Sequence, residues 1–196
     1  MGIDVFRREI SDYRAIQWGE KLLLFYLAGI LAGIILLQFP DKEVLARYGF
    51  FSESTIERLR YMDVNTKGLF FYCFRKRSVV AILLVIFAMT NLAPIVASIY
   101  TSWIGFGTGA WITVASVRYG ILGPLLYLGI IMPQALCYLP AFLLYIRWMA
   151  GLYMEQERPF GKMVQLFIIF LVFLVGILLE SYVNPSVLKN FIKIFL

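Results

Sequence analysis

Five apolar runs, separated by polar or glycine-rich stretches, dominate the pattern of this chain. A membrane-spanning helix needs about 20 consecutive, mostly apolar residues, and each run has roughly this length. The pattern therefore predicts an all-α fold, a polytopic transmembrane helical bundle that forms one integral membrane domain over residues 1–196. We predict five membrane-spanning helices with these bounds: 22–39, 79–97, 100–117, 121–146 and 163–182.

A polar segment over residues 40–78 follows the first apolar run. Ser54 and Glu57 have the spacing of a capping box, which predicts the start of a short amphipathic helix. The segment ends with LFFYCFRKR, in which aromatic side chains precede three cations, Arg75, Lys76 and Arg77. Aromatic and basic residues gather at membrane–water interfaces, so we interpret the segment as interfacial and expect the cations at lipid phosphates. A simple polar loop is the alternative, and the C-terminal stretch VLKNFIKIF is expected to lie on the membrane surface as well.

The fourth run is irregular, because MPQALCYLPA places Pro133 and Pro140 inside an apolar helix. A proline there removes a hydrogen bond and clashes with the preceding turn, and in a bilayer the freed backbone groups must be covered by protein or water. We predict that the chain bends or unwinds around 132–134. Gln134 and Tyr138 share one helix face beside this break. An ordinary kinked helix and a discontinuous helix that lines a cavity both stay open, and two half-helices would raise the count to six spans.

Glu180 stands at the end of the fifth run. An ionisable group in a membrane segment is a functional hypothesis by default, so we group it with the residues of the break as candidate cavity lining. The alternative is that Glu180 lies at the headgroup level and marks the end of the helix, since Asn184 and Pro185 follow.

Small residues form two further patterns. Gly29 and Gly33, each preceded by alanine, lie on one face of the first run, which is typical of close helix packing. We expect packing within the chain, with pairing of two copies as a homodimer as the alternative. GFGTGA over residues 105–110 lacks the strand and the Lys-Ser/Thr pair of a phosphate-binding loop, so it predicts helix packing or unwound backbone.

Composition supports the membrane assignment, since 61% of the residues are hydrophobic and only 15% are charged, against about 25% charged in a soluble domain. The net charge of +6 suits attraction to anionic lipid, and without a folded basic module we do not expect nucleic-acid binding.

The chain has no histidine, and Cys73 and Cys137 are expected to be free buried thiols. We therefore expect no enzyme activity, no metal and no cofactor. The polar first 21 residues predict no cleavable signal peptide, and the basic residues leave the orientation open.

The order of these features resembles the stage II sporulation protein M family, also called DUF95 proteins. MPQALCYLPA has the spacing of the family's PHG-x-x-E-x-PA element, and LLESYVNP is similar to its E-a-f-v-T-P element, with Glu180 and Pro185 at the matching positions. The chain departs from the family where its histidine, glycine and glutamate are replaced by Gln134, Ala135 and Tyr138.

The resemblance implies a multi-pass protein of the bacterial cytoplasmic membrane without known enzyme activity. Relatives act in engulfment during sporulation, in a complex with peptidoglycan-degrading partners, and others serve the maturation, export or immunity of circular bacteriocins. Two functions follow as hypotheses. The first is a non-enzymatic scaffold in the lipid bilayer that binds other membrane proteins or peptidoglycan hydrolases. The second is a transporter, exporter or channel subunit that works with a separate ATPase.

Overall fold

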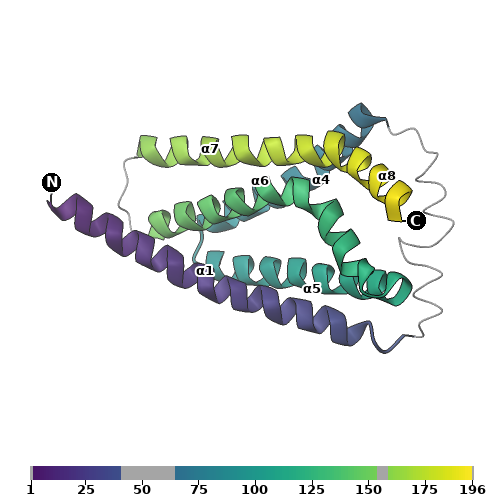
Figure 1. Ribbon diagram of the computed structural model, residues 1–196. Helices are drawn as coiled ribbons and strands as arrows, with labels where there is room; N and C mark the ends of the chain where they lie inside the picture. Colours follow the sequence, from purple (N-terminus) through teal and green to yellow (C-terminus); the bar gives the residue numbers. More distant parts are fainter. Residues whose placement is uncertain (1, 41–64, 154–158, 196) are drawn as a thin grey trace.

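The computed structural model describes residues 2–40, 65–153 and 159–195, and every regular element within these ranges is a helix. The predicted all-α class is therefore confirmed, whereas the capping box at Ser54 and Glu57 lies outside the described residues. The helices labelled in Figure 1 are α1 (Gly2–Leu36), α4 (Thr66–Ala88), α5 (Ala93–Tyr119), α6 (Leu122–Tyr153), α7 (Pro159–Leu178) and α8 (Asn184–Phe195). A π-helical turn, η1 (Leu179–Val183), lies between α7 and α8.

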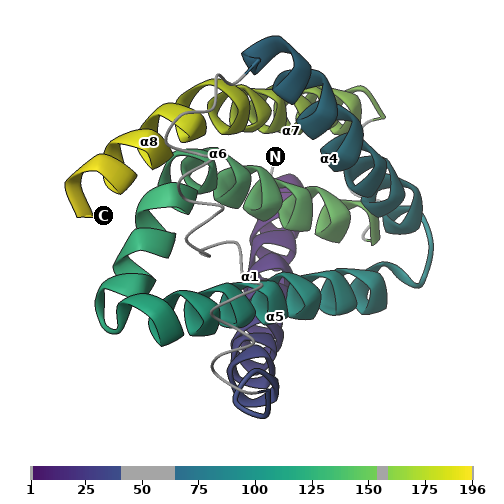
Figure 2. The same cartoon turned by 90° about the vertical axis from the view of Figure 1, so that its right-hand side faces the viewer.

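Three helical stretches are long and apolar enough to cross a membrane, namely Ile16–Leu36, Leu122–Leu152 and Gly161–Asn190. They support the interpretation of the chain as a membrane protein. The long helices run back and forth between two ends of the molecule, as Figures 1 and 2 show. The end of α1, the beginning of α4 and α8 lie at one end of the molecule, and the turn between α4 and α5 lies at the other.

The predicted span over 79–97 is not one helix, because α4 ends at Ala88 and α5 begins at Ala93. The Thr90 hydroxyl closes the turn between them by donating to the Phe87 carbonyl at 2.8 Å. Pro94 then lies in the first turn of α5, where a missing backbone N–H costs no hydrogen bond. The boundary predicted at residue 78, between the interfacial segment and the second span, is also wrong. A single helix, α4, runs through the aromatic and basic stretch and on into the apolar one.

Glycines bring α1 and α5 into direct backbone contact. A Cβ atom added at Gly29 would overlap the Ser102 carbonyl oxygen, and one added at Gly105 would overlap the Tyr26 carbonyl oxygen. The same reciprocal contact is repeated one turn further along each helix, at Gly33 and Gly109. The small face of α1 thus lies against α5 of the same chain, and the GFGTGA stretch is helical and packed.

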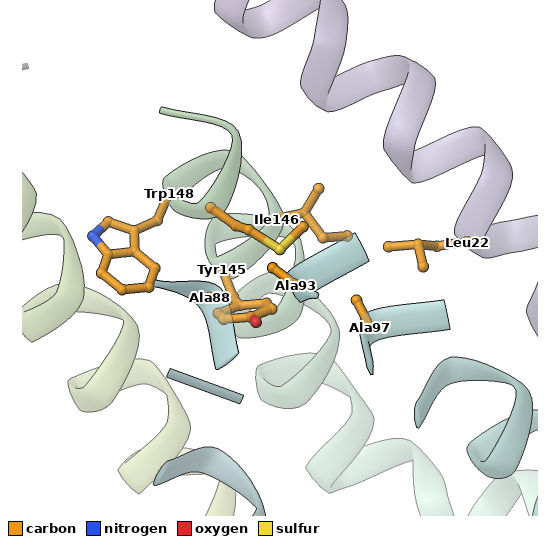
Figure 3. Packing of buried hydrophobic residues seen from close by; sticks show 8 residues of the cluster. Leu22, Ala88, Ala93, Ala97, Tyr145, Ile146 and Trp148 are labelled. Carbon is orange, nitrogen blue, oxygen red and sulfur yellow. The ribbon is translucent and has the colours of Figure 1, made fainter. Parts of the chain in front are cut away.

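The largest buried cluster lies where α1, α4, α5 and α6 meet (Figure 3). It combines three alanines with five large side chains, and the full set is Leu22, Ala88, Ala93, Ala97, Tyr145, Ile146, Trp148 and Met149. The two polar atoms of its aromatic rings are satisfied, since the Tyr145 hydroxyl donates to the Leu84 carbonyl at 2.9 Å and the Trp148 indole donates to the Lys162 carbonyl at 3.1 Å. This cluster ties the C-terminal part of α6 to α4 and α7.

α6 is one continuous helix that contains both Pro133 and Pro140. Figure 1 shows that it is bent into a shorter N-terminal arm and a longer C-terminal arm. Such a bend is the usual consequence of proline rings that clash with the preceding turn. The shorter arm lies close to α5, since a Cβ added at Gly123 would overlap the backbone of Ala115. The fourth apolar run is therefore a bent helix and not two half-helices that form a hairpin.

Candidate functional site

Three polar side chains from three separate elements meet beside the longer arm of α6. The Arg77 guanidinium of α4 donates to both carboxylate oxygens of Glu180 in η1, at 2.7 Å to Oε1 and 3.1 Å to Oε2. The Tyr138 hydroxyl of α6 donates to Glu180 Oε2 at 2.6 Å. The Arg77 guanidinium carbon also lies 5.5 Å from the centre of the Tyr138 ring, within the range of a cation–π contact. We call these residues the Arg77–Glu180–Tyr138 cluster.

Local structure places Glu180 in this position. The helix does not end there, because α7 continues through the π-helical turn η1 into α8. The turn is widened by one residue, so that the Asn184 N–H bonds the Leu179 carbonyl. Ser181 is fully buried, and its hydroxyl donates to the Ile177 and Leu178 carbonyls at 2.9 and 3.2 Å. Such π-turns inside α-helices are frequently found at functional sites.

A glycine makes room for the tyrosine of the cluster. A Cβ atom added at Gly176 would lie 2.6 Å from Cε1 of Tyr138, which is closer than real side chains approach. On the same side the Tyr138 ring packs against Phe173, with ring centroids 5.7 Å apart. Gly176 and Phe173 thus define the position from which the Tyr138 hydroxyl reaches Glu180.

An amide pair lies on the same face of α6, one turn before Tyr138. The Asn184 side-chain nitrogen donates to Gln134 Oε1 at 2.9 Å. The other polar atom of that amide, Asn184 Oδ1, is buried and has no hydrogen-bond partner. A buried acceptor without a partner is unusual and calls for a physical explanation.

The structure brings together three of the residues that the sequence pattern grouped as candidate cavity lining, Gln134, Tyr138 and Glu180. All three are paired with other side chains, and Arg77 and Asn184 are the partners that sequence reasoning missed. Pro133 and Pro140 lie in the same helix. A signal for the ion pair was present, since charged groups in membrane segments almost always pair with one another.

The Arg77 side chain is bound to Glu180, a partner that the prediction of interfacial cations did not include. Arg75 and Lys76 are exposed. An arginine guanidinium keeps its charge in proteins, so Arg77 and Glu180 form an ion pair.

The arrangement joins helices through paired polar groups. The carboxylate of Glu180 accepts hydrogen bonds from the guanidinium and the phenol, so both of its oxygens are occupied. In the part of the chain that the structure describes, no group of three or more Cys, Asp or Glu residues is placed to hold a metal ion. The cluster thus links α4, α6 and the end of α7 through charged hydrogen bonds, which are stronger than neutral ones.

Removal of the Tyr138 hydroxyl is expected to weaken this link without breaking it. In a Tyr138→Phe variant the ring contacts with Phe173 and Arg77 remain, and only the hydrogen bond to Glu180 is lost. A hydrogen bond to a charged group contributes about 1.5–3 kcal/mol, and we expect a loss near the lower value because Arg77 still pairs with the carboxylate. Thermal unfolding in detergent measures the change, with Tyr72→Phe, an exposed tyrosine of α4, as the control.

A groove of about 810 Å³ lies on the outer side of the contact between α1 and α5. Its lining is apolar apart from two serine hydroxyls, at Ser98 and Ser102, and the Ser98 hydroxyl already donates to the Pro94 carbonyl at 2.8 Å. The groove therefore offers room for packing and few groups for polar recognition.

Comparison with protein-family models, with curated proteins and with solved structures finds no match to this chain.

Proposed function

We propose that this chain is a non-enzymatic subunit of a membrane complex, with α1, α4, α5, α6 and α7 as five spans in the bacterial cytoplasmic membrane. The observation that carries the proposal is the Arg77–Glu180–Tyr138 cluster, whose guanidinium, carboxylate and phenol are paired with one another. Polar groups that satisfy one another rigidify a structure. The cluster thus holds α4, α6 and the end of α7 in fixed positions relative to one another, as a scaffold requires.

The outward faces of the helices supply the surface that a scaffold needs. Along α1 the side chains of Leu23, Leu24 and Leu31 are each more than half exposed. In a bilayer such a surface packs against acyl chains or against the helices of another protein. The resemblance to the stage II sporulation protein M family supports other membrane proteins, or peptidoglycan hydrolases, as the partners.

Purification of the tagged chain from native membranes in a mild detergent tests the scaffold. We expect at least one other protein to be recovered in a fixed ratio to the chain, as measured by quantitative mass spectrometry. A tagged membrane protein of similar size from the same cells is the control for non-specific recovery. Recovery of the chain alone, as a monomer, would contradict the proposal.

A second candidate function is a transport or channel subunit that works with a separate ATPase. The observation in its favour is the buried, unpartnered Asn184 Oδ1 of α8, whose side-chain nitrogen binds Gln134 on the face of α6 that also carries Tyr138. Transporters place such polar groups beside interrupted helices, where they bind ions or substrate near the middle of the bilayer.

Flux measurements in liposomes separate the two functions. If the chain transports ions, Gln134→Leu should reduce the flux, because it removes the side-chain partner of Asn184 and makes the face apolar. Glu180→Gln should reduce it as well, and Lys21→Gln, which changes an exposed cation of α1 outside the cluster, is the control. No flux in the intact protein, with and without ATP-hydrolysing partners from the same membranes, would exclude an autonomous or ATP-driven channel.

A further inference from the structure

The first half of α4 has two chemically different faces. Cys73 and Arg77, one turn apart, point into the bundle, since Cys73 is only 7% exposed and Arg77 is bound to Glu180. Because successive residues of a helix are about 100° apart, this contact turns Arg75 and Lys76 away from the bundle. Both are exposed, and among the described residues no ion pair involves either of them.

Each outward cation follows an exposed aromatic residue by one turn. Phe71 is 71% exposed and lies one turn before Arg75, and Tyr72 is 58% exposed and lies one turn before Lys76. Residues four apart on a helix are neighbours on its surface. The result is a compact patch of two aromatic rings and two cations, which we call the α4 outer face (Phe71, Tyr72, Arg75 and Lys76).

The surface beyond the α4 outer face is apolar and exposed. It continues along the same helix through Val79, Ile82, Leu83 and Ile86, all of which are exposed. A cationic patch followed by an apolar strip matches the two parts of a phospholipid, because the strip contacts acyl chains where the patch contacts the headgroup. An acidic protein segment would complement the cations but not this strip.

We propose that the α4 outer face binds the headgroup of an anionic phospholipid. Arg75 and Lys76 contact its phosphate oxygens, and Phe71 and Tyr72 lie at the boundary between headgroup and acyl chains, where aromatic residues are enriched in membrane proteins. The driving force is charge complementarity between two exposed cations and an anionic leaflet. This lipid site does not depend on the scaffold function, because it concerns the surface that faces away from the cluster.

Lipid binding to the purified full-length chain, measured by native mass spectrometry, tests the proposal. The probes are phosphatidylglycerol and phosphatidylcholine of the same chain length. A cation near an anionic membrane surface strengthens binding about fivefold, so the double variant Arg75→Gln/Lys76→Gln should bind phosphatidylglycerol roughly 25-fold more weakly and phosphatidylcholine unchanged. Lys21→Gln, an exposed cation on α1, is the matched control and should leave both affinities within about twofold of the parent.

Further variants separate the parts of the site. Phe71→Ala should weaken the binding of both lipids and keep the preference for phosphatidylglycerol, because it removes apolar contact but no charge. All variants alter exposed side chains, and their unfolding temperatures should match that of the parent. Equal binding of the two lipids by the parent chain would overturn the proposal. So would an unchanged affinity for phosphatidylglycerol in the double variant, or binding of an acidic peptide in preference to this lipid.

Discussion

Replacement of Glu180 by leucine is expected to lower the free energy of unfolding by about 3 kcal/mol. The change leaves the Arg77 guanidinium without its carboxylate partner and the Tyr138 hydroxyl without its acceptor. Breaking a buried ion pair typically costs 3–5 kcal/mol, and we expect the lower end because the Arg77 side chain is 45% exposed while that of Glu180 is 16% exposed. Unfolding in mixed SDS and mild-detergent micelles, followed by circular dichroism, measures the loss.

A double variant distinguishes an unpaired charge from lost packing. Removing both partners in Arg77→Met/Glu180→Leu eliminates the uncompensated charge, and such apolar replacements of buried pairs are often neutral. We therefore expect the double variant to recover most of the stability that Glu180→Leu loses. Arg75→Gln, an exposed cation two residues from Arg77, is the control and should change stability by less than about 0.5 kcal/mol. A double variant as unstable as the single one would show that the pair is not the cause.

Substitution of Gly105 by alanine is expected to destabilise the chain by about 2–3 kcal/mol. The added methyl group would overlap the Tyr26 carbonyl oxygen of α1, and backbone atoms cannot move aside as a flexible side chain does. The helices α1 and α5 must therefore separate, and the reciprocal contact at Gly29 is lost as well. In a membrane such backbone packing is a main source of helix association, so the loss extends over several turns.

The same helix provides a matched control at Gly107. A Cβ atom there meets nothing within 4 Å, and alanine favours a helix over glycine by about 1 kcal/mol. Gly107→Ala should therefore be neutral or slightly stabilising in the same unfolding measurement. Equal effects of the two substitutions would mean that the cost arises in α5 itself and not at its contact with α1.

Local sequence patterns were sufficient for the class of the fold and for several of its details. Long apolar runs predicted an all-helical chain with membrane-spanning segments, because each segment satisfies its backbone hydrogen bonds internally. The prolines at 133 and 140 predicted a bend in α6 for the same local reason, and α6 is bent. The small residues Gly29 and Gly33 indicated a close helix contact. In each case the physical cause acts within a few turns of one helix.

The boundaries of the helices and the partners of the polar side chains could not be predicted from such local patterns. Hydropathy does not separate 79–88 from 93–97, and a turn closed by Thr90 divides them. Arg77 and Glu180 are 103 positions apart, and Gln134 and Asn184 are 50 apart. Which cation meets the carboxylate depends on the rotation of α4 about its axis, and Arg75 would be as suitable chemically because it carries the same guanidinium.

Patterns along the chain were thus enough to predict a helical chain, apolar enough for a membrane, with a bend in the helix that contains its two prolines. The packing of the helices was needed to see that Arg77 turns toward Glu180 while Arg75 and Lys76 turn outward, and that η1 continues the helix through Glu180 instead of ending it. The physical reason is that helix periodicity fixes angles within one helix, whereas the register between helices is set by backbone contacts such as those at Gly29 and Gly105.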